Sequence, residues 1–381
     1  MSTVPAAWRA SRARIVAAAA VFGLAYGLSA PLIAQALDRR GLGETLIGLN
    51  AAMYALGVLA VATSLPRFAT RLGLRPVITL ALLAVAVLLP GFPLAPWLWL
   101  WFPLRFALGI ASESMFVTSE TWVNASSDDA SRGTGVALYT AALSLGFALG
   151  PVILGAVGAE GMLPYAIGAA CALAAFAIVA LPGVEAPPVA REAPRGSLWS
   201  IGRLVPLALA ATALNSALET AGLTFMPIYA MRLGWDATSA NLLIAVLMIG
   251  AIVLQLPIGW LGTRYERRSV VLLLAVIATA GACAWPFVLG ERWLAYALAF
   301  LWGGAFVGIY TLMMTAVGSR FQGGALLSVY AIMSIAWAAG AMVGPALTGA
   351  AMEISRNGLP WFAALACGTF ALLALRRREL V

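Results

Sequence analysis

Long apolar runs alternate along this chain with short breaks that contain charged residues, glycine or proline. A helix needs about 20 mainly apolar residues to cross the hydrocarbon of a bilayer, so runs of that length mark candidate spans. The candidate spans cover residues 15–36, 46–65, 76–95, 97–119, 133–157, 161–182, 203–230, 237–258, 270–289, 293–317, 324–350 and 360–375. The pattern therefore predicts an all-α polytopic membrane protein with twelve transmembrane helices.

Composition agrees with the pattern and adds a division into halves. Hydrophobic residues make up 62% of the chain and charged residues only 10%, whereas soluble domains run near one-quarter charged. The breaks between spans are mostly too short for a soluble domain. The longest polar stretch, 183–202, is rich in Pro, Arg and Glu, and we interpret it as a cytoplasmic linker between an N-terminal six-helix bundle, 1–182, and a C-terminal one, 203–381.

The distribution of arginine predicts the orientation of the chain in the membrane. All 23 basic residues are arginine, and 17 of them lie on the side of the N-terminus, against five on the opposite side. Cytoplasmic loops carry the excess of basic residues, so both termini are expected in the cytoplasm and the protein in a bacterial inner membrane. The net charge of +8 is then a topology signal that suits anionic lipid headgroups, and no nucleic-acid partner is expected.

The scarcity of histidine and cysteine limits the possible chemistry. The chain has no histidine, which excludes Ser-His catalysis and histidine-ligated metals. Its three cysteines, Cys171, Cys283 and Cys367, each stand alone in an apolar run, where a free thiol usually packs as a small hydrophobe. We therefore expect no enzyme activity, no cofactor and no metal, and any proton traffic would have to use carboxylates.

The second half of the chain repeats features of the first half at a spacing of about 190–196 residues. The same four features recur in the same order, which makes coincidence a poor explanation. They are Pro31 and Pro227, Thr70-Arg71 and Thr263-Arg264, Gly133 to Tyr139 and Gly324 to Tyr330, and finally Gly146-x-x-x-Gly150-Pro151 and Gly340-x-x-x-Gly344-Pro345.

The Gly-x-x-x-Gly-Pro segments have a physical meaning. Small residues four apart lie on one helix face and let a neighbouring helix approach closely, while proline removes a backbone hydrogen bond and permits a bend. Tight static packing is one interpretation and a moving helix pair is the other. Their presence at matching positions of both halves favours helices that rock against a partner.

Over essentially its whole length the chain resembles the major facilitator superfamily of transporters. The loop after the second span resembles the family's Gly-x-x-x-Asp-Arg-x-Gly-Arg-Arg signature, Arg105-x-x-x-Gly109 its second signature, and the Gly146 segment that of its proton-driven exporters. Ser119-Glu120-Thr-Trp122-Val-Asn124 resembles a YcaD-like bacterial branch. The resemblance implies the major facilitator fold of two pseudo-symmetric six-helix bundles and alternating access.

The loop signature departs from the family pattern at residues that the resemblance makes important. Pro66 and Thr70 stand where the family usually has Gly and Asp, and Thr263 repeats the loss of Asp in the second half. In the family that Asp helps to latch the cytoplasmic side. Without it, we expect Arg71 to find a helix C-terminus or another acceptor.

Three ionisable residues lie well inside the predicted spans, where each one needs a reason because a charge in hydrocarbon is costly. Arg105 and Glu113 lie eight residues apart in one span, about 12 Å along its axis. We interpret Glu113 as a proton-binding carboxylate with Arg105 as its switching partner; a permanent structural ion pair is the alternative. Glu219 is a second candidate, as a proton or cation site or as a neutral packed carboxyl. Glu120, at a span end, is expected to be a gate or loop anchor.

Four further side chains near the middle of the predicted spans are candidates to line a solute cavity. They are Tyr26, Asn215, Tyr310 and Trp337. Aromatic walls with few polar groups suit an amphipathic or aromatic solute, although ordinary helix packing explains any one of these aromatics alone.

These features lead to a function hypothesis with one open alternative. The leading hypothesis is a secondary active transporter, expected as a monomer, that exports a small organic solute in exchange for protons. Uptake by proton symport or facilitated diffusion would use the same residues, because direction depends on which states are loaded. A sensor or channel is not expected, since no output domain or filter segment is present.

Overall fold

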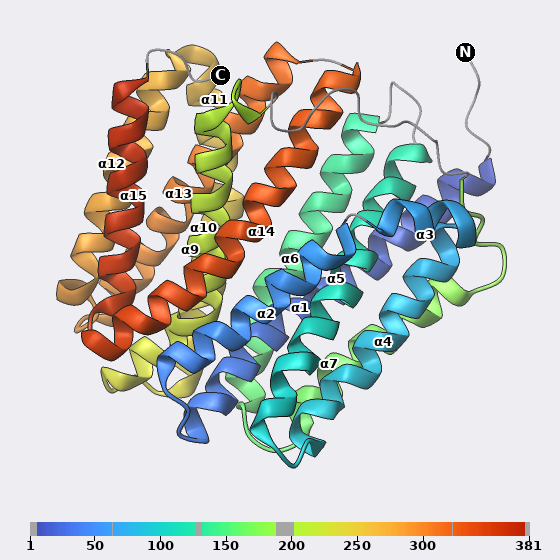
Figure 1. Cartoon of the computed structure of the whole chain (residues 1–381), viewed down its shortest axis with the longest axis horizontal. Coiled ribbons are helices and arrows are strands. Elements are labelled where there is room, and N and C mark those ends of the chain that lie inside the picture. The colour runs from blue at the N-terminus through green and yellow to red at the C-terminus, as the bar shows by residue number, and fades with distance from the viewer. Residues whose placement is uncertain (1–5, 63, 127–131, 188–201, 322, 378–381) are drawn as a thin grey trace. The chain divides into compact units, whose positions relative to one another are not determined.

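A computed structural model describes the chain apart from residues 1–5, 63, 127–131, 188–201, 322 and 378–381 (Figure 1). Its long helices are α1 (Ala6–Arg39), α2 (Glu44–Ala62), α4 (Leu74–Leu94), α5 (Trp101–Ala125), α6 (Arg132–Val157), α7 (Leu163–Ala180), α9 (Pro206–Arg232), α10 (Ala237–Val253), α12 (Arg267–Val288), α13 (Arg292–Arg320), α14 (Gly323–Ile354) and α15 (Gly358–Arg376). Shorter elements are α3 (Leu65–Leu72), η1 (Leu98–Leu100) and α11 (Gln255–Arg264). Each predicted span overlaps one long helix, so the predicted all-α polytopic fold is confirmed.

Not all of the long helices are equally apolar. Ten spans in the described part of the chain are long and apolar enough to cross a membrane, and α5 and α9 are not among them. These two helices are 25 and 27 residues long and carry Arg105, Glu113, Asn215 and Glu219. Their lower apolarity therefore comes from the polar residues that the sequence singles out.

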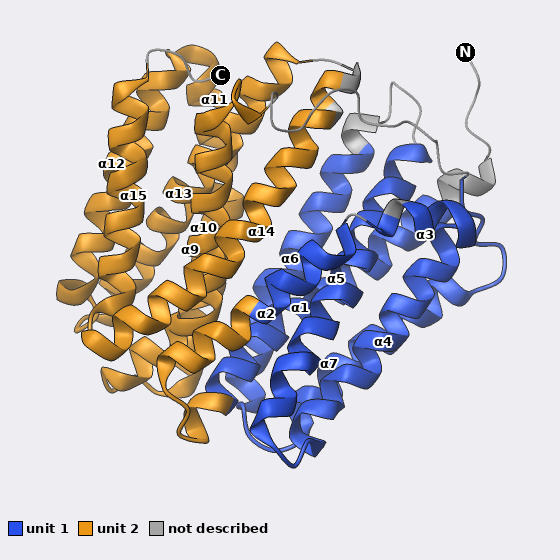
Figure 2. Ribbon diagram, in the orientation of Figure 1, with its two compact units in different colours: residues 1–36, 53–191 blue, residues 37–52, 192–381 orange. Residues whose placement is uncertain are grey.

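The contacts of the chain divide it into two compact units, coloured separately in Figure 2. Unit 1 comprises 1–36 and 53–191, and unit 2 comprises 37–52 and 192–381. The predicted halves meet instead at the linker 183–202, most of which lies outside the described residues. The segment 37–52, which holds the end of α1 and the start of α2, packs with the C-terminal helices, although the repeat places it in the N-terminal half.

In unit 1, glycines of α6 lie directly against the backbone of α1. A Cβ built on Gly146 would lie 2.3 Å from the carbonyl oxygen of Ala20, and one on Gly150 would lie 2.4 Å from the amide nitrogen of Leu28. Real Cβ atoms do not approach so closely, so only glycine fits at these crossings.

Unit 2 repeats this crossing between α14 and α9. A Cβ on Gly340 would lie 2.1 Å from the carbonyl oxygen of Ala213, and one on Gly344 would lie 2.5 Å from Cα of Ala217. The Gly-x-x-x-Gly-Pro segments thus do bring two backbones together in both units, as the small-residue pattern indicates.

A second crossing also occurs once in each unit. In unit 1, Gly109 of α5 packs on α2, where its Cβ would lie 2.1 Å from the carbonyl oxygen of Tyr54. In unit 2, Gly303 of α13 packs on α10, where its Cβ would lie 2.3 Å from the carbonyl oxygen of Leu247. These contacts make Tyr54 and Leu247 equivalent positions of the repeat.

Matching arginines cap the last helix of each unit. Arg75, at the start of α4, donates to the carbonyl oxygens of Val179, Ala180 and Leu181 at 2.9–3.2 Å, just where α7 ends. Arg268, at the start of α12, donates to those of Leu375 and Arg377 at 3.2 and 3.0 Å, where α15 ends. Helix C-termini leave carbonyls unsatisfied and carry partial negative charge, so a guanidinium there satisfies both needs.

Candidate functional site

Arg105 of unit 1 is a buried cation whose Nε and Nη1 have no hydrogen-bond partner among the described residues. Only 4% of it is exposed. Its guanidinium carbon lies 5.3 Å from the centre of the Tyr54 ring. A cation–π contact of this kind contributes about 1–2 kcal/mol, whereas removing a charge from water without a hydrogen-bonded partner costs several kcal/mol. The aromatic face therefore does not compensate the charge by itself.

Glu113 does not form an ion pair with Arg105. The carboxylate is half-buried and makes no hydrogen bond or ion pair with the described residues. The predicted switching pair is thus not formed in this structure, because the 12 Å rise between the two positions is not closed by their side chains. Glu120, further along α5, is exposed.

Tyr26 lies in a cluster of aromatic rings beside Arg105. Its ring centre lies 5.6 Å from that of Tyr54, 5.5 Å from that of Phe116 and 4.7 Å from that of Phe147. These rings come from α1, α2, α5 and α6, so one cluster joins four helices of unit 1. Tyr26 is buried by this packing, and its neighbours give the surroundings of Arg105 an aromatic character.

In unit 2, the structure brings two predicted residues of α9 together. The Nδ2 of Asn215 donates to Oε2 of Glu219 at 3.4 Å, one helical turn away. Asn215 is buried and its Oδ1 has no hydrogen-bond partner, whereas Glu219 is half-buried. The other two candidates, Tyr310 on α13 and Trp337 on α14, are half-buried.

The loop arginines of the repeat remain at the surface. Thr70 donates its hydroxyl to the carbonyl oxygen of Arg67 at 3.0 Å, and Thr263 donates to that of Trp260 at 2.7 Å. Each threonine therefore bonds to its own helix. Arg71 is exposed and makes no hydrogen bond or ion pair with the described residues, so the expected acceptor is absent here; Arg264 lies over the Trp260 ring at 5.4 Å.

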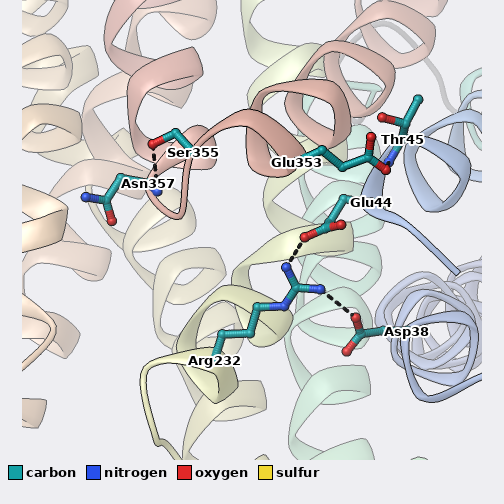
Figure 3. A network of polar contacts seen from close by, with 7 residues as sticks. All are labelled: Asp38, Glu44, Thr45, Arg232, Glu353, Ser355 and Asn357. Atoms are coloured by element: carbon teal, nitrogen blue, oxygen red, sulfur yellow. Dashed lines mark hydrogen bonds and ion pairs between the residues drawn. The ribbon is translucent and has the colours of Figure 1, made fainter. Parts of the chain in front are cut away.

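Sequence reasoning missed a charged network within unit 2, which Figure 3 shows. Arg232, at the end of α9, forms an ion pair through Nη1 with Glu44 and through Nη2 with Asp38, the latter at 2.9 Å. Asp38 and Glu44 flank the turn between α1 and α2. A pair of acidic residues around one turn and a lone arginine at the end of a long span are the signal that could have suggested it.

The same segment is held by a second contact in Figure 3. The backbone N–H of Thr45, in the first turn of α2, donates to Oε1 of Glu353 at 3.1 Å. A carboxylate satisfies the free amides at a helix N-terminus. Gly48 of α2 packs nearby, where a Cβ would lie 2.2 Å from the carbonyl oxygen of Pro345. Charge, capping and close packing therefore all bind 37–52 to α9 and α14.

The described residues include no group of three or more His, Cys, Asp or Glu that could hold a metal. Unit 2 has a groove of about 500 Å³ between α12 and α15, lined among others by Val276, Thr279, Leu365 and Leu372. No charged residue lines it, so it offers less chemistry than the polar positions on α5 and α9.

Proteins with similar sequences include two uncharacterized MFS-type transporters. The chain is 26% identical over 351 residues to the MFS-type transporter YfkF of Bacillus subtilis, covering 89% of this chain and 88% of that protein. It is 23% identical to the MFS-type transporter YE1530 of Yersinia enterocolitica, covering 94% and 93%.

Solved structures agree on the fold. A point mutant of the nucleoside transporter NupG matches with a TM-score of 0.82 at 14% identity, covering 97% of this chain and 100% of that one. A bacterial homolog of the human lysosomal transporter Spinster, in an inward-facing and unoccupied conformation, matches with a TM-score of 0.76 at 14% identity, covering 98% of both chains.

A family model decides the assignment. The model described as Major Facilitator Superfamily matches residues 15–238 and, in an overlapping match, 208–380, so that it covers nearly the whole chain. Together with the two sets of helices and their matching glycine crossings, this match shows that the chain is a multi-pass membrane transporter of small molecules and belongs to the major facilitator superfamily.

Proposed function

We propose that this protein is a secondary active transporter that exports a small organic solute from a bacterial cell in exchange for protons, by alternating access. It would act as a monomer in the cytoplasmic membrane with both termini in the cytoplasm, as the arginine distribution indicates. The observation that carries the proton coupling is the state of Glu113, a half-buried carboxylate on α5 that forms no ion pair or hydrogen bond with the described residues. A carboxylate without a fixed cation can be protonated in one state and ionised in another.

Glu219 is the second carboxylate in this proposal. Its one hydrogen bond, from the Asn215 amide at 3.4 Å, is long, and an amide can accompany either the charged or the neutral carboxyl. Asn215, Tyr26, Tyr310 and Trp337 would contact the solute. Because Glu219 and Glu113 belong to different units, protons could be bound at either position.

The glycine crossings and the Arg232 network would serve the change of state. Gly146, Gly150 and Pro151 in unit 1, and their counterparts Gly340, Gly344 and Pro345 in unit 2, would let helix pairs slide where no side chain intervenes. Arg232 would hold the turn between α1 and α2 on unit 2 during part of the cycle and release it in another part. Arg71 and Arg264, exposed here, would find acceptors only in the second state.

The test is an accumulation screen with a compound panel in an efflux-deficient bacterium under a controlled proton gradient. Wild type is expected to lower the accumulation of at least one compound, and Glu113→Gln is expected to abolish this effect. Glu160→Gln, which changes an exposed glutamate, is the matched control and should behave like wild type. Glu219→Gln is measured in parallel to compare the two carboxylates.

Each outcome decides one part of the proposal. Higher accumulation with wild type than without it would replace export by uptake. Solute movement that ignores an imposed pH gradient would remove the proton coupling, while full activity of Glu113→Gln would move the proton site to Glu219.

A further inference from the structure

The least compensated charge in unit 1 is the guanidinium of Arg105. It is 96% buried, and Nε and Nη1 lack hydrogen-bond partners. Glu113 on the same helix does not form an ion pair with it, and its contact with Tyr54 is to the face of the ring at 5.3 Å. A buried arginine normally has an acceptor, so a missing acceptor indicates a group that the protein itself does not supply.

Arg105 is the fifth residue of α5, but its guanidinium contacts a residue that lies further from the ends of its own helix. Tyr54, which it contacts, is ten residues into α2, about 15 Å from the first residue of that helix. Tyr26, whose ring centre lies 5.6 Å from that of Tyr54, is about 30 Å from the first residue of α1 and about 20 Å from its last residue on the same scale. Because the guanidinium is 96% buried beside the Tyr54 ring, it is not exposed at a surface where lipid phosphates would meet it.

Unit 2 provides an internal control for the role of this arginine. Gly109 packs on the carbonyl oxygen of Tyr54, and Gly303 packs in the same way on that of Leu247. Four residues before Gly303 stands Ala299, where unit 1 has Arg105. Ala299 and Leu247 are both buried. The helix crossing thus forms with an alanine and a leucine, so packing does not require Arg105 or the ring beside it.

We propose that Arg105 binds the negatively charged group of the transported solute, and that the solute is a small aromatic or amphipathic carboxylate. One guanidinium balances one negative charge, which favours a carboxylate over a doubly charged phosphate. The rings of Tyr26, Tyr54 and Phe116 suit an aromatic body next to the anionic group. This inference rests on the proposed solute transport but not on its direction or its coupling ion.

The test uses purified protein and the concentration of a compound that gives half of its maximal increase in melting temperature. The probes are benzoate, salicylate and phenylacetate, each paired with its neutral amide: benzamide, salicylamide and phenylacetamide. We expect at least one carboxylate to stabilise wild type, and its amide not to. Arg105→Ala should raise the half-maximal concentration about tenfold or more, because a charged hydrogen bond is lost. Arg105→Lys should fall between the two.

The matched control is Arg67→Ala, which removes an exposed arginine and should bind like wild type. Equal binding of carboxylates to wild type and Arg105→Ala would overturn the inference, as would stabilisation by the amides alone or by none of the six compounds. A neutral solute that is nevertheless exported with protons would overturn this inference and leave the proposed function intact. Carboxylate binding through Arg105 without any effect of a pH gradient on transport would support this inference and remove the proton coupling from the proposed function.

Discussion

The two units share their packing and differ in where they place charge. The close crossings at Gly146 and Gly340, and at Gly109 and Gly303, match one another, and so do the arginine caps of α7 and α15. Of the ionisable residues that lie inside the predicted spans, Arg105 and Glu113 stand in the fourth long helix of unit 1, α5, whereas Glu219 stands in the first long helix of unit 2, α9. The repeat therefore supplies a scaffold that either unit could use, and the functional groups are placed on it asymmetrically.

The second helices of the two units show a related difference. The N-terminus of α10 is capped by the adjacent Asp236, which accepts from the backbone N–H of Ser239 at 2.9 Å. The N-terminus of α2 has Gly43 just before it and receives Glu353 of α14 instead. The N-terminus of α10 is capped by a residue next to it in the sequence, whereas that of α2 is capped by a residue 308 positions away. This contact places the start of α2 in unit 2.

The largest loss of stability is expected at the glycine crossings that both units share. Replacing Gly109 by Leu, or Gly303 by Leu, forces a side chain into a backbone carbonyl and should destabilise the protein by about 3 kcal/mol or more. The two losses should be similar, as measured by melting temperature and folded yield in size-exclusion chromatography. Gly222→Ala is the control, since nothing lies within 4 Å of a Cβ at that helical position, and it should be neutral or stabilising. A well-folded Gly109→Leu would show that the crossing is not close in solution.

A smaller loss of stability is expected when the buried arginine of unit 1 is introduced at the matching position of unit 2. Ala299→Arg places in unit 2 the charge that Arg105 provides in unit 1, without a tyrosine at Leu247. It should destabilise by about 2.5–3 kcal/mol, whereas Ala299→Leu, an apolar enlargement at the same position, separates the cost of charge from that of size. Thermal unfolding of both variants measures this. If Ala299→Arg were as stable as wild type, an arginine without a partner would cost little stability at this crossing. The missing partner of Arg105 would then need no explanation.

The ion pairs of unit 2 should differ in strength according to their exposure. The side chain of Arg232 is 40% exposed, but that of Glu44 only 11%, so Arg232→Gln should cost about 1 kcal/mol. The Arg292–Asp236 pair, at 3.2 Å with both side chains about half exposed, is the control, and Arg292→Gln should cost less than about 0.5 kcal/mol. Double-mutant cycles with Glu44→Gln and Asp236→Asn measure the two couplings. Equal couplings would contradict a special role for the Arg232 network.

The smallest expected effect is a pH dependence of the stability of the first turn of α10. The pKa of Asp236 is lowered from its ordinary value of 3.8 because the Ser239 N–H, the Ser239 hydroxyl and Arg292 favour the ionised form. A group with a lowered folded-state pKa stabilises the fold above its unfolded pKa and loses that contribution as the pH falls through the folded value. Amide exchange in the first turn of α10 should therefore accelerate as the pH is lowered below about 3.8, relative to the intrinsic rate.

Asp236→Asn gives the control for this titration. An asparagine still caps a helix but does not ionise in this range, so the pH dependence should vanish while most protection remains. Protection of the first turn of α2, which depends on Glu353, should be lost separately in Glu353→Gln. A pH dependence that persists in Asp236→Asn would assign it to another group.

The sequence by itself determined the helices, the repeat and the positions of the buried ionisable residues, because hydrophobic length and short glycine and proline motifs act locally. Tertiary structure alone decided which side chains meet. A helical-wheel angle does not say whether two side chains close a 12 Å rise, so the separation of Arg105 from Glu113 could not be predicted. Nor does a repeat say that Arg232 and Glu353 hold the start of α2, since that choice depends on ion pairing and backbone packing between segments about 190 and 308 residues apart.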